Sequence, residues 1–162
     1  MAFQPSKGLS PISLKGRALR LLSGREYSRA ELERKLQPFE EVPGALAQAL
    51  DALQAKDFIN EQRVVDSVLY RRAAKLGSAR IRQELQSKGL DPAAVLDAVA
   101  SLHSTELARA REVWRKKFGS PPLDAAERGK QQRFLLARGF SGDAVRKVVA
   151  GGDDDGWDGA SD

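Results

Sequence analysis

The chain has 162 residues, enough for one ordinary domain or an array of small units, and 41% of them are hydrophobic. No segment approaches the ~20 consecutive apolar residues that span a bilayer, and the absence of cysteine excludes disulfides. Residues 1–150 hold all 27 lysines and arginines but only 17 of the 22 acidic residues, a formal charge of +10 that predicts an anionic partner.

The first unit, residues 14–62, follows a leader, residues 1–13, that we expect to be flexible because it is polar and contains Pro, Ser and Gly. Its stretch "LKGRALRLLSG" predicts an amphipathic helix that ends at a glycine. Ser28 caps the next helix, and Glu31 completes a capping-box pattern. Pro43 begins the third helix, which carries an apolar stripe of Leu46, Leu50 and Leu53.

The second unit, residues 63–104, and the third, residues 105–150, each predict three further helices. In the second unit, Gly89 suits the left-handed position after a helix, and Asp91 followed by proline is typical of a helix start. Residues 151–162, "GGDDDGWDGASD", form an acidic tail that we expect to be disordered.

The three units are copies of one pattern. A shift of 49 places Pro43 on Pro92, and a shift of 50 places Gly89 on Gly139. A unit of this size is marginally stable alone, so neighbouring units must pack against one another. The sequence therefore predicts an all-α protein of three tandem three-helix repeats that form an elongated, curved array.

The segment "FINEQRVVDSVLYRRAAKLGSARIRQELQSKGL" resembles the central signature of the RecX family of regulatory proteins. The matching positions of the G-x-x-[RK]-[IL]-x-x-E-L-x-x-K-G-[IVL] pattern are Gly77, Arg80, Ile81, Glu84, Leu85, Lys88, Gly89 and Leu90. "ALRLLSGREYSRAELERKL" resembles the family's opening, and "RFLLARGFSGDAV" its third repeat. Asn60 stands where an Asp is more usual, a small change at an expected helix cap.

The resemblance implies a protein that binds RecA and the filament that RecA forms on single-stranded DNA. It implies inhibition of ATP hydrolysis, strand exchange and filament extension, and so modulation of DNA repair, recombination and the SOS response. It leaves open whether inhibition acts by capping filament ends, by blocking nucleotide turnover or by loosening subunit contacts. We expect a cytoplasmic location, because nothing in the sequence predicts a signal peptide or a membrane span. We also expect a monomer, and weak non-specific DNA binding because the chain is basic.

Two alternatives use the same residues. One is a non-specific nucleic-acid-binding helical protein without RecA regulation, because three-helix units with a basic helix resemble helix-turn-helix domains. The other is a structural helical adaptor of the solenoid type. The RecX-like motifs, in order and in all three repeats, favour the regulatory reading.

Candidate partner-binding residues are the basic positions of the second and third units that we expect to be exposed. They could pair with an acidic filament surface or with phosphate. They are Arg71, Arg72, Lys75, Arg80, Arg82, Lys88, Arg115, Lys116, Lys117, Lys130, Arg133 and Arg138. In "WRKKFG", Trp114 and Phe118 could stack on bases, but their i, i+4 spacing favours a core pair.

No enzymatic activity, cofactor or metal is predicted. The lone His103 has neither a cysteine nor a second histidine to share a metal ion, and no G-x-x-x-x-G-K-[ST] motif is present for a nucleotide. Glu31, Glu33 and Glu84 are interpreted as partners in surface ion pairs. One further hypothesis is that "DDDGWD" folds back over the basic surface. The alternative is that it is only a solubilising tail.

Overall fold

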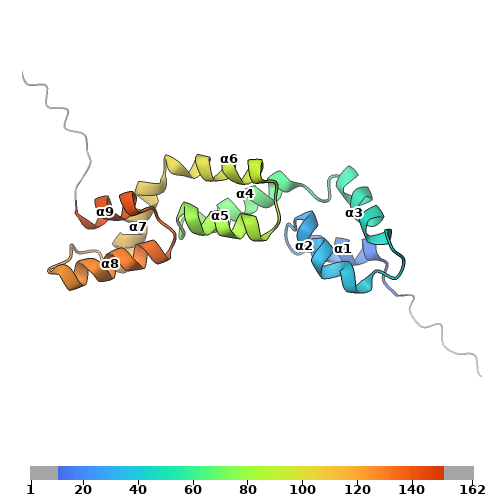
Figure 1. The fold of residues 1–162 in the computed structure, drawn as a ribbon, viewed down its shortest axis with the longest axis horizontal. Helices are drawn as coiled ribbons and strands as arrows, with labels where there is room; N and C mark the ends of the chain where they lie inside the picture. Colours follow the sequence, from blue (N-terminus) through green and yellow to red (C-terminus); the bar gives the residue numbers. More distant parts are fainter. Residues whose placement is uncertain (1–10, 152–162) are drawn as a thin grey trace, which may run out of the picture. The chain divides into compact units, whose positions relative to one another are not determined.

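The computed structural model describes residues 11–151, which form nine α-helices and one 3-10 turn without a strand in that range (Figure 1). The predicted all-α class is therefore confirmed. Residues 1–10 and 152–162, which include most of the expected leader and tail, lie outside the described residues. The elements are α1 (Leu14–Leu22), α2 (Arg29–Leu36), η1 (Gln37–Phe39), α3 (Ala45–Ala55), α4 (Glu61–Arg72), α5 (Ser78–Ser87), α6 (Pro92–His103), α7 (Glu106–Lys117), α8 (Ala125–Ala137) and α9 (Gly142–Val149).

The chain divides into two compact units. Unit 1 is Met1–Val64 with Lys88–Leu90, and unit 2 is Val65–Ser87 with Asp91–Asp162. Within the described residues, no helix is both long enough and apolar enough to cross a membrane. The repeat boundaries at residues 62, 104 and 150 stay a prediction.

Unit 1 is built on α1, α2 and α3, the blue-to-cyan helices of Figure 1, which pack against one another. Its core contains the predicted stripe of α3 together with Ala18, Leu32 and Leu36. Ser28 makes the predicted capping box: its hydroxyl accepts from the Glu31 amide, and its own amide donates to the Glu31 carboxylate (2.8 Å). Such a cap contributes about 0.5–2 kcal/mol.

The start of α3 differs from the prediction. The helix begins at Ala45 rather than at Pro43, because Gly44 takes the left-handed backbone conformation (φ 87°) and turns the chain. The Glu40 carboxylate accepts the Leu46 amide (2.8 Å) and so satisfies one of the donors left free at the helix start. The helix start is thus fixed by Gly44 and the Glu40 side chain rather than by Pro43.

Unit 2 holds α5 packed on α6, and α7, α8 and α9 packed on one another. The core of the α7–α9 group contains Ala110, Leu135 and Phe140 with the apolar face of α9. Asp91 caps α6 as predicted, accepting from the Ala93 amide. These caps and stripes were legible in the sequence because they depend on residues close together in the chain.

Gly77 and Gly139 bring two stretches of backbone into contact within unit 2. The Gly77 amide donates to the Arg138 carbonyl (2.8 Å), and the Ala79 amide donates to the Gly139 carbonyl (3.1 Å). A Cβ atom on Gly77 would lie 2.2 Å from the carbonyl carbon of Gly139. Gly139 itself is in the left-handed conformation (φ 91°), like Gly89 at the matching position of the repeat (φ 67°). The contact therefore requires glycine at both positions.

Candidate binding surfaces

Four of the predicted basic residues surround one groove of about 440 Å³ in unit 2. Lys75 follows α4, Lys116 and Lys117 end α7, and Arg138 follows α8. Val113, Phe134 and Ala74 complete the lining. We call this the basic groove. Its members come from three segments far apart in the sequence, so it could not be assembled from the sequence alone.

Phe134 gives the basic groove an aromatic surface. Its ring meets Phe118 edge to face, with centroids 5.3 Å apart, and the Phe134 side chain packs against the core of the α7–α9 group. Lys117 Nζ lies 5.5 Å and Arg138 Cζ 4.8 Å from the ring centroid. Both cations are thus held near the ring by cation–π attraction, with their charges still available to a ligand.

The charges around the groove are only partly balanced. Arg115 donates to Glu112 (2.7 Å) and holds the pKa of that carboxyl below its usual value, while Lys116 lies 3.8 Å from the same carboxylate. Among the described residues, Lys75 makes no ion pair. A groove with excess positive charge and an aromatic wall suits an anionic partner that also offers an apolar or aromatic group.

Two other predicted residues already have structural contacts in unit 2. Arg72 Nε donates to Glu84 (3.1 Å), an ion pair on the surface as expected of Glu84. Arg80 Nη1 donates to the Ala137 carbonyl (2.9 Å) beside the glycine contact. Both side chains are exposed, but each is fixed to its own unit, so a partner would have to compete with these bonds.

The remaining predicted positions of unit 2 are exposed and do not line the basic groove. Arg71 bonds to the carbonyl of Ser67 one turn earlier (3.3 Å). The others lie along α5, α7 and α8 and are Arg82, Arg115, Lys130 and Arg133. They carry charge but are not gathered into a hollow, so they suit diffuse electrostatic attraction better than a defined contact.

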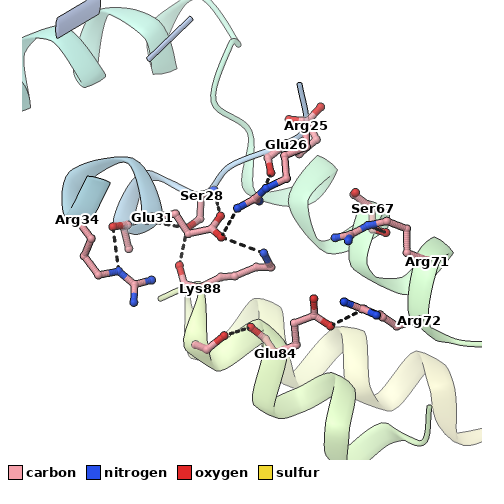
Figure 2. Close-up of polar contacts among 12 residues, drawn as sticks. Arg25, Glu26, Ser28, Glu31, Arg34, Ser67, Arg71, Arg72, Glu84 and Lys88 are labelled. Atoms are coloured by element: carbon pink, nitrogen blue, oxygen red, sulfur yellow. Dashed lines mark hydrogen bonds and ion pairs between the residues drawn. The ribbon is translucent and has the colours of Figure 1, made fainter. Parts of the chain in front are cut away.

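Lys88 is not the exposed side chain that was expected. It is 8% exposed, and its ammonium group donates to the Glu31 carboxylate of unit 1 (3.0 Å). Its carbonyl accepts from the Ser28 hydroxyl, as Figure 2 shows. The lysine of the family-like motif therefore stabilises the first turn of α2, a role that the sequence pattern did not reveal.

Glu31 is the centre of this contact and not a surface ion-pair residue. It accepts from Lys88, from Arg25 (3.1 Å) and from the Ser28 amide (Figure 2). Burial raises the pKa of Glu31, but the bonds from Arg25, Ser28 and Lys88 outweigh burial and hold the pKa below its ordinary value. Glu33, by contrast, forms the expected exposed pair with Arg29.

The aromatic residues of "WRKKFG" pack against α8. The Trp114 indole donates to Gln131 (2.8 Å), a residue that is 2% exposed and donates in turn to the Ser120 carbonyl. Phe118 lies against Phe134. These contacts support the core interpretation of Trp114 and Phe118, because stacking on bases would require their release.

Sequence reasoning missed Glu106, the first residue of α7. Its side chain is buried, and its carboxylate accepts from the amide and hydroxyl of Ser78 and from the amide of Ser141. It thereby satisfies backbone donors at the starts of both α5 and α9. An acidic residue at the first position of a helix is so common that the sequence gives no sign of this second task.

Arg109, one turn later on α7, was also missed. Its guanidinium donates to the Ala73 carbonyl (2.9 Å) and the Leu76 carbonyl (2.7 Å) after α4, and to the Leu102 carbonyl in α6. Burial lowers the pKa of Arg109, and the negative charge of Glu106 opposes this effect only in part. Together Glu106 and Arg109 bind helix starts and helix ends to α7, which positions the segments that form the basic groove.

Residues 11–151 contain no cluster of three or more His, Cys, Asp or Glu side chains that could hold a metal ion. His103 is exposed at the end of α6, beside the negative end of the helix dipole.

Comparison with known proteins gives a consistent result. A family model described as RecX, third three-helix domain, matches residues 104–149. The regulatory protein RecX of Leptothrix cholodnii is 55% identical over 138 residues, covering 85% of this chain and 88% of that one. RecX of Ralstonia nicotianae is 46% identical over 143 residues, covering 88% and 90%. A crystal structure of RecX from Lactobacillus salivarius superposes with a TM-score of 0.72 at 20% identity, over 85% of this chain and 93% of that one, which shows the shared fold.

Proposed function

Because the chain belongs to the RecX family of regulatory proteins, we propose that it binds RecA and the filament that RecA forms on single-stranded DNA. Bound there, it lowers ATP hydrolysis, strand exchange and filament extension, and so modulates DNA repair, recombination and the SOS response in the cytoplasm. The observation that carries the proposal is the 55% identity to a regulatory protein RecX along 85% of the chain. A regulatory role without chemistry of its own also agrees with the cationic surfaces described above.

The basic groove is the contact that we assign to the filament. It offers Lys75, Lys116, Lys117 and Arg138 around an aromatic wall, and both an acidic protein surface and a DNA backbone are anionic. Exposed cations elsewhere in unit 2 add weaker contacts. Several weak contacts to neighbouring subunits of one filament sum to a useful affinity through high effective concentration.

The direct test is the ATPase activity of the cognate RecA on single-stranded DNA, titrated with this protein at physiological salt. We expect inhibition well below one molecule per RecA subunit, because one bound molecule affects a filament rather than a single subunit. A gel-filtered sample heated until unfolded serves as the control for buffer effects. Unchanged hydrolysis and filament length at equimolar protein would contradict the proposal.

Non-specific nucleic-acid binding is the second candidate, favoured by the charge of +10 over residues 1–150. Such binding depends steeply on salt because each phosphate contact releases counterions. If binding to single-stranded DNA persists while RecA activity is unaffected, this second function replaces the first. If inhibition of RecA persists at a salt concentration that abolishes binding to DNA alone, the protein partner is the principal one.

A further inference from the structure

A second hollow, of about 450 Å³, lies in unit 2 beside the last described residues of the chain. Its wall includes Arg128 of α8, Arg146 and Val149 of α9, and three residues outside the helices, Pro121, Pro122 and Ala150. Two arginines thus line the hollow together with prolines and aliphatic side chains. This hollow shares no residue with the basic groove.

The cations of this hollow are weakly engaged by the described residues. No acidic side chain within residues 11–151 pairs with Arg128. Arg146 pairs only with Asp143 at 3.3 Å, and both side chains are 70% exposed. An ion pair this exposed contributes little, so Arg146 remains available to another carboxylate.

Apolar side chains next to the hollow are also uncovered. Leu123 follows Pro122 and is 92% exposed. Leu136 lies one turn beyond Gln132, which lines the hollow from α8, and is 49% exposed. An apolar wall with uncovered leucines beside two available cations fits an occupant that has both carboxylates and a large apolar group.

The chain supplies such an occupant next to the hollow. Ala150 lines the hollow, and residues 152–162 that follow contain five aspartates, one tryptophan and no lysine or arginine. Asp153 lies three residues after Ala150, so an extended chain places it up to ~10 Å from Ala150. The chain from Asp153 to Trp157 is long enough to turn back toward the hollow. Covalent attachment at this short distance gives the segment a high effective concentration at the hollow.

We propose that residues 152–162 bind in this hollow, with Trp157 against the wall formed by Pro121, Pro122 and Val149 and the aspartates facing Arg128 and Arg146. The contact lies within one chain. It covers two cations of unit 2 and reduces the attraction of this surface for other anions. The proposal does not depend on RecA, since it concerns the chain alone.

The fluorescence of Trp157 in the full chain tests the contact. The chain has two tryptophans, so subtracting the signal of a Trp157→Phe variant isolates Trp157. We expect blue-shifted emission and low acrylamide quenching at low salt, independent of protein concentration. The double variant Arg128→Glu with Arg146→Glu should raise the quenching constant about threefold, since the attraction becomes repulsion. The matched control, Arg71→Glu with Arg82→Glu, changes the net charge equally and should leave quenching unchanged.

A charge exchange separates a direct contact from a change of fold. Adding Asp153→Lys and Asp154→Lys to the double arginine variant should restore protection of Trp157, because the ion pairs are rebuilt with opposite sign. Circular dichroism checks that each variant remains helical. Three results overturn the proposal: Trp157 as quenchable in the wild type as in the double variant, protection that survives the double reversal, or protection that appears only as protein concentration rises.

Discussion

At the residue scale, the contact of Glu31 with Lys88 in unit 1 shows how a family-like motif can mislead about exposure. The motif presents a basic residue before a glycine, which reads as a surface cation. In the structure Lys88 is buried, and Glu31 receives both its ammonium group and the Arg25 guanidinium. Removing one member of a partly buried contact between a carboxylate and two cations destabilises the fold more than breaking an exposed ion pair, because the remaining members lose a charged partner.

We predict that Glu31→Gln lowers the free energy of unfolding by about 1–3 kcal/mol at pH 7, because the buried Ser28 and Lys88 lose a charged acceptor. The pKa of Glu31 is lowered in the folded protein, so its contribution to stability is complete above its ordinary pKa of 4.5 and is lost as the pH falls through the lower folded value. The difference between variant and wild type should therefore shrink in acid. Urea unfolding at several pH values measures it.

Glu33→Gln is the matched control for this experiment, because Glu33 lies on the same helix in an exposed pair with Arg29. That substitution should change the free energy of unfolding by less than about 0.5 kcal/mol. Equal effects of the two substitutions, or a Glu31→Gln effect that does not depend on pH, would refute the role given to Glu31.

At the scale of elements, the repeated Lys/Arg–Gly–Leu/Phe segment makes corresponding contacts in the two units. In unit 1 the Lys88 carbonyl accepts from Ser28, and in unit 2 the Arg138 carbonyl accepts from Gly77. These pairs fall at matching positions of the repeat. The segment is repeated because in each case its backbone binds the start of a preceding helix.

Glycine is required at these contacts for steric reasons. A Cβ atom on Gly89 would lie 2.6 Å from Cβ of Ala30, and one on Gly139 would lie 2.6 Å from the Arg80 amide nitrogen. Both glycines also have positive φ. The sequence indicated the second reason, which is local, but not the first, which involves residues about 60 positions away.

Gly77→Ala should be strongly destabilising, because the added methyl group would overlap the backbone of Gly139 and Phe140 at 2.2 Å. Neither of these two backbone segments can move without breaking the hydrogen bonds between them, so we expect a loss of at least about 2 kcal/mol in the free energy of unfolding. Thermal unfolding followed by circular dichroism measures the loss.

Gly142→Ala provides the comparison within the same unit. Gly142 begins α9, and the nearest atom to its added Cβ would be Arg146 Nη1 at 3.6 Å, an ordinary contact. Alanine is the better helix former, so this variant should be neutral or slightly stabilised. A Gly77→Ala protein as stable as Gly142→Ala would show that the backbone contact is not formed in solution.

At the scale of the whole molecule, the sequence predicted what local patterns control. The all-α class, the capping box at Ser28, the cap at Asp91 and the left-handed glycines are confirmed. The predicted start of α3 was wrong, because Gly44 and the Glu40 carboxylate determine where the helix begins, and neither is a standard sequence signal for a helix start. Family membership was also legible, since the motif positions are close in sequence.

The surfaces were predicted less well, because they depend on distant residues. The sequence nominated twelve cations of similar weight, and the structure gathers four around the basic groove and buries Lys88. It also reveals Glu106 and Arg109, each of which has partners that lie 28 to 36 residues away. Charge type can be read from the chain, whereas the grouping of charges requires the fold.

The measurement that tests the central claim most directly is inhibition of RecA ATPase by a groove variant, Lys75→Glu with Lys117→Glu, beside the wild type. Reversing two exposed charges that face an anionic partner should raise the half-inhibiting concentration about tenfold. The control, Arg20→Glu with Lys56→Glu, makes the same charge change at exposed positions of unit 1 and should stay within about twofold of the wild type. Selective loss in the groove variant is the result we predict; equal inhibition by all three proteins would contradict the assignment of the basic groove to the filament.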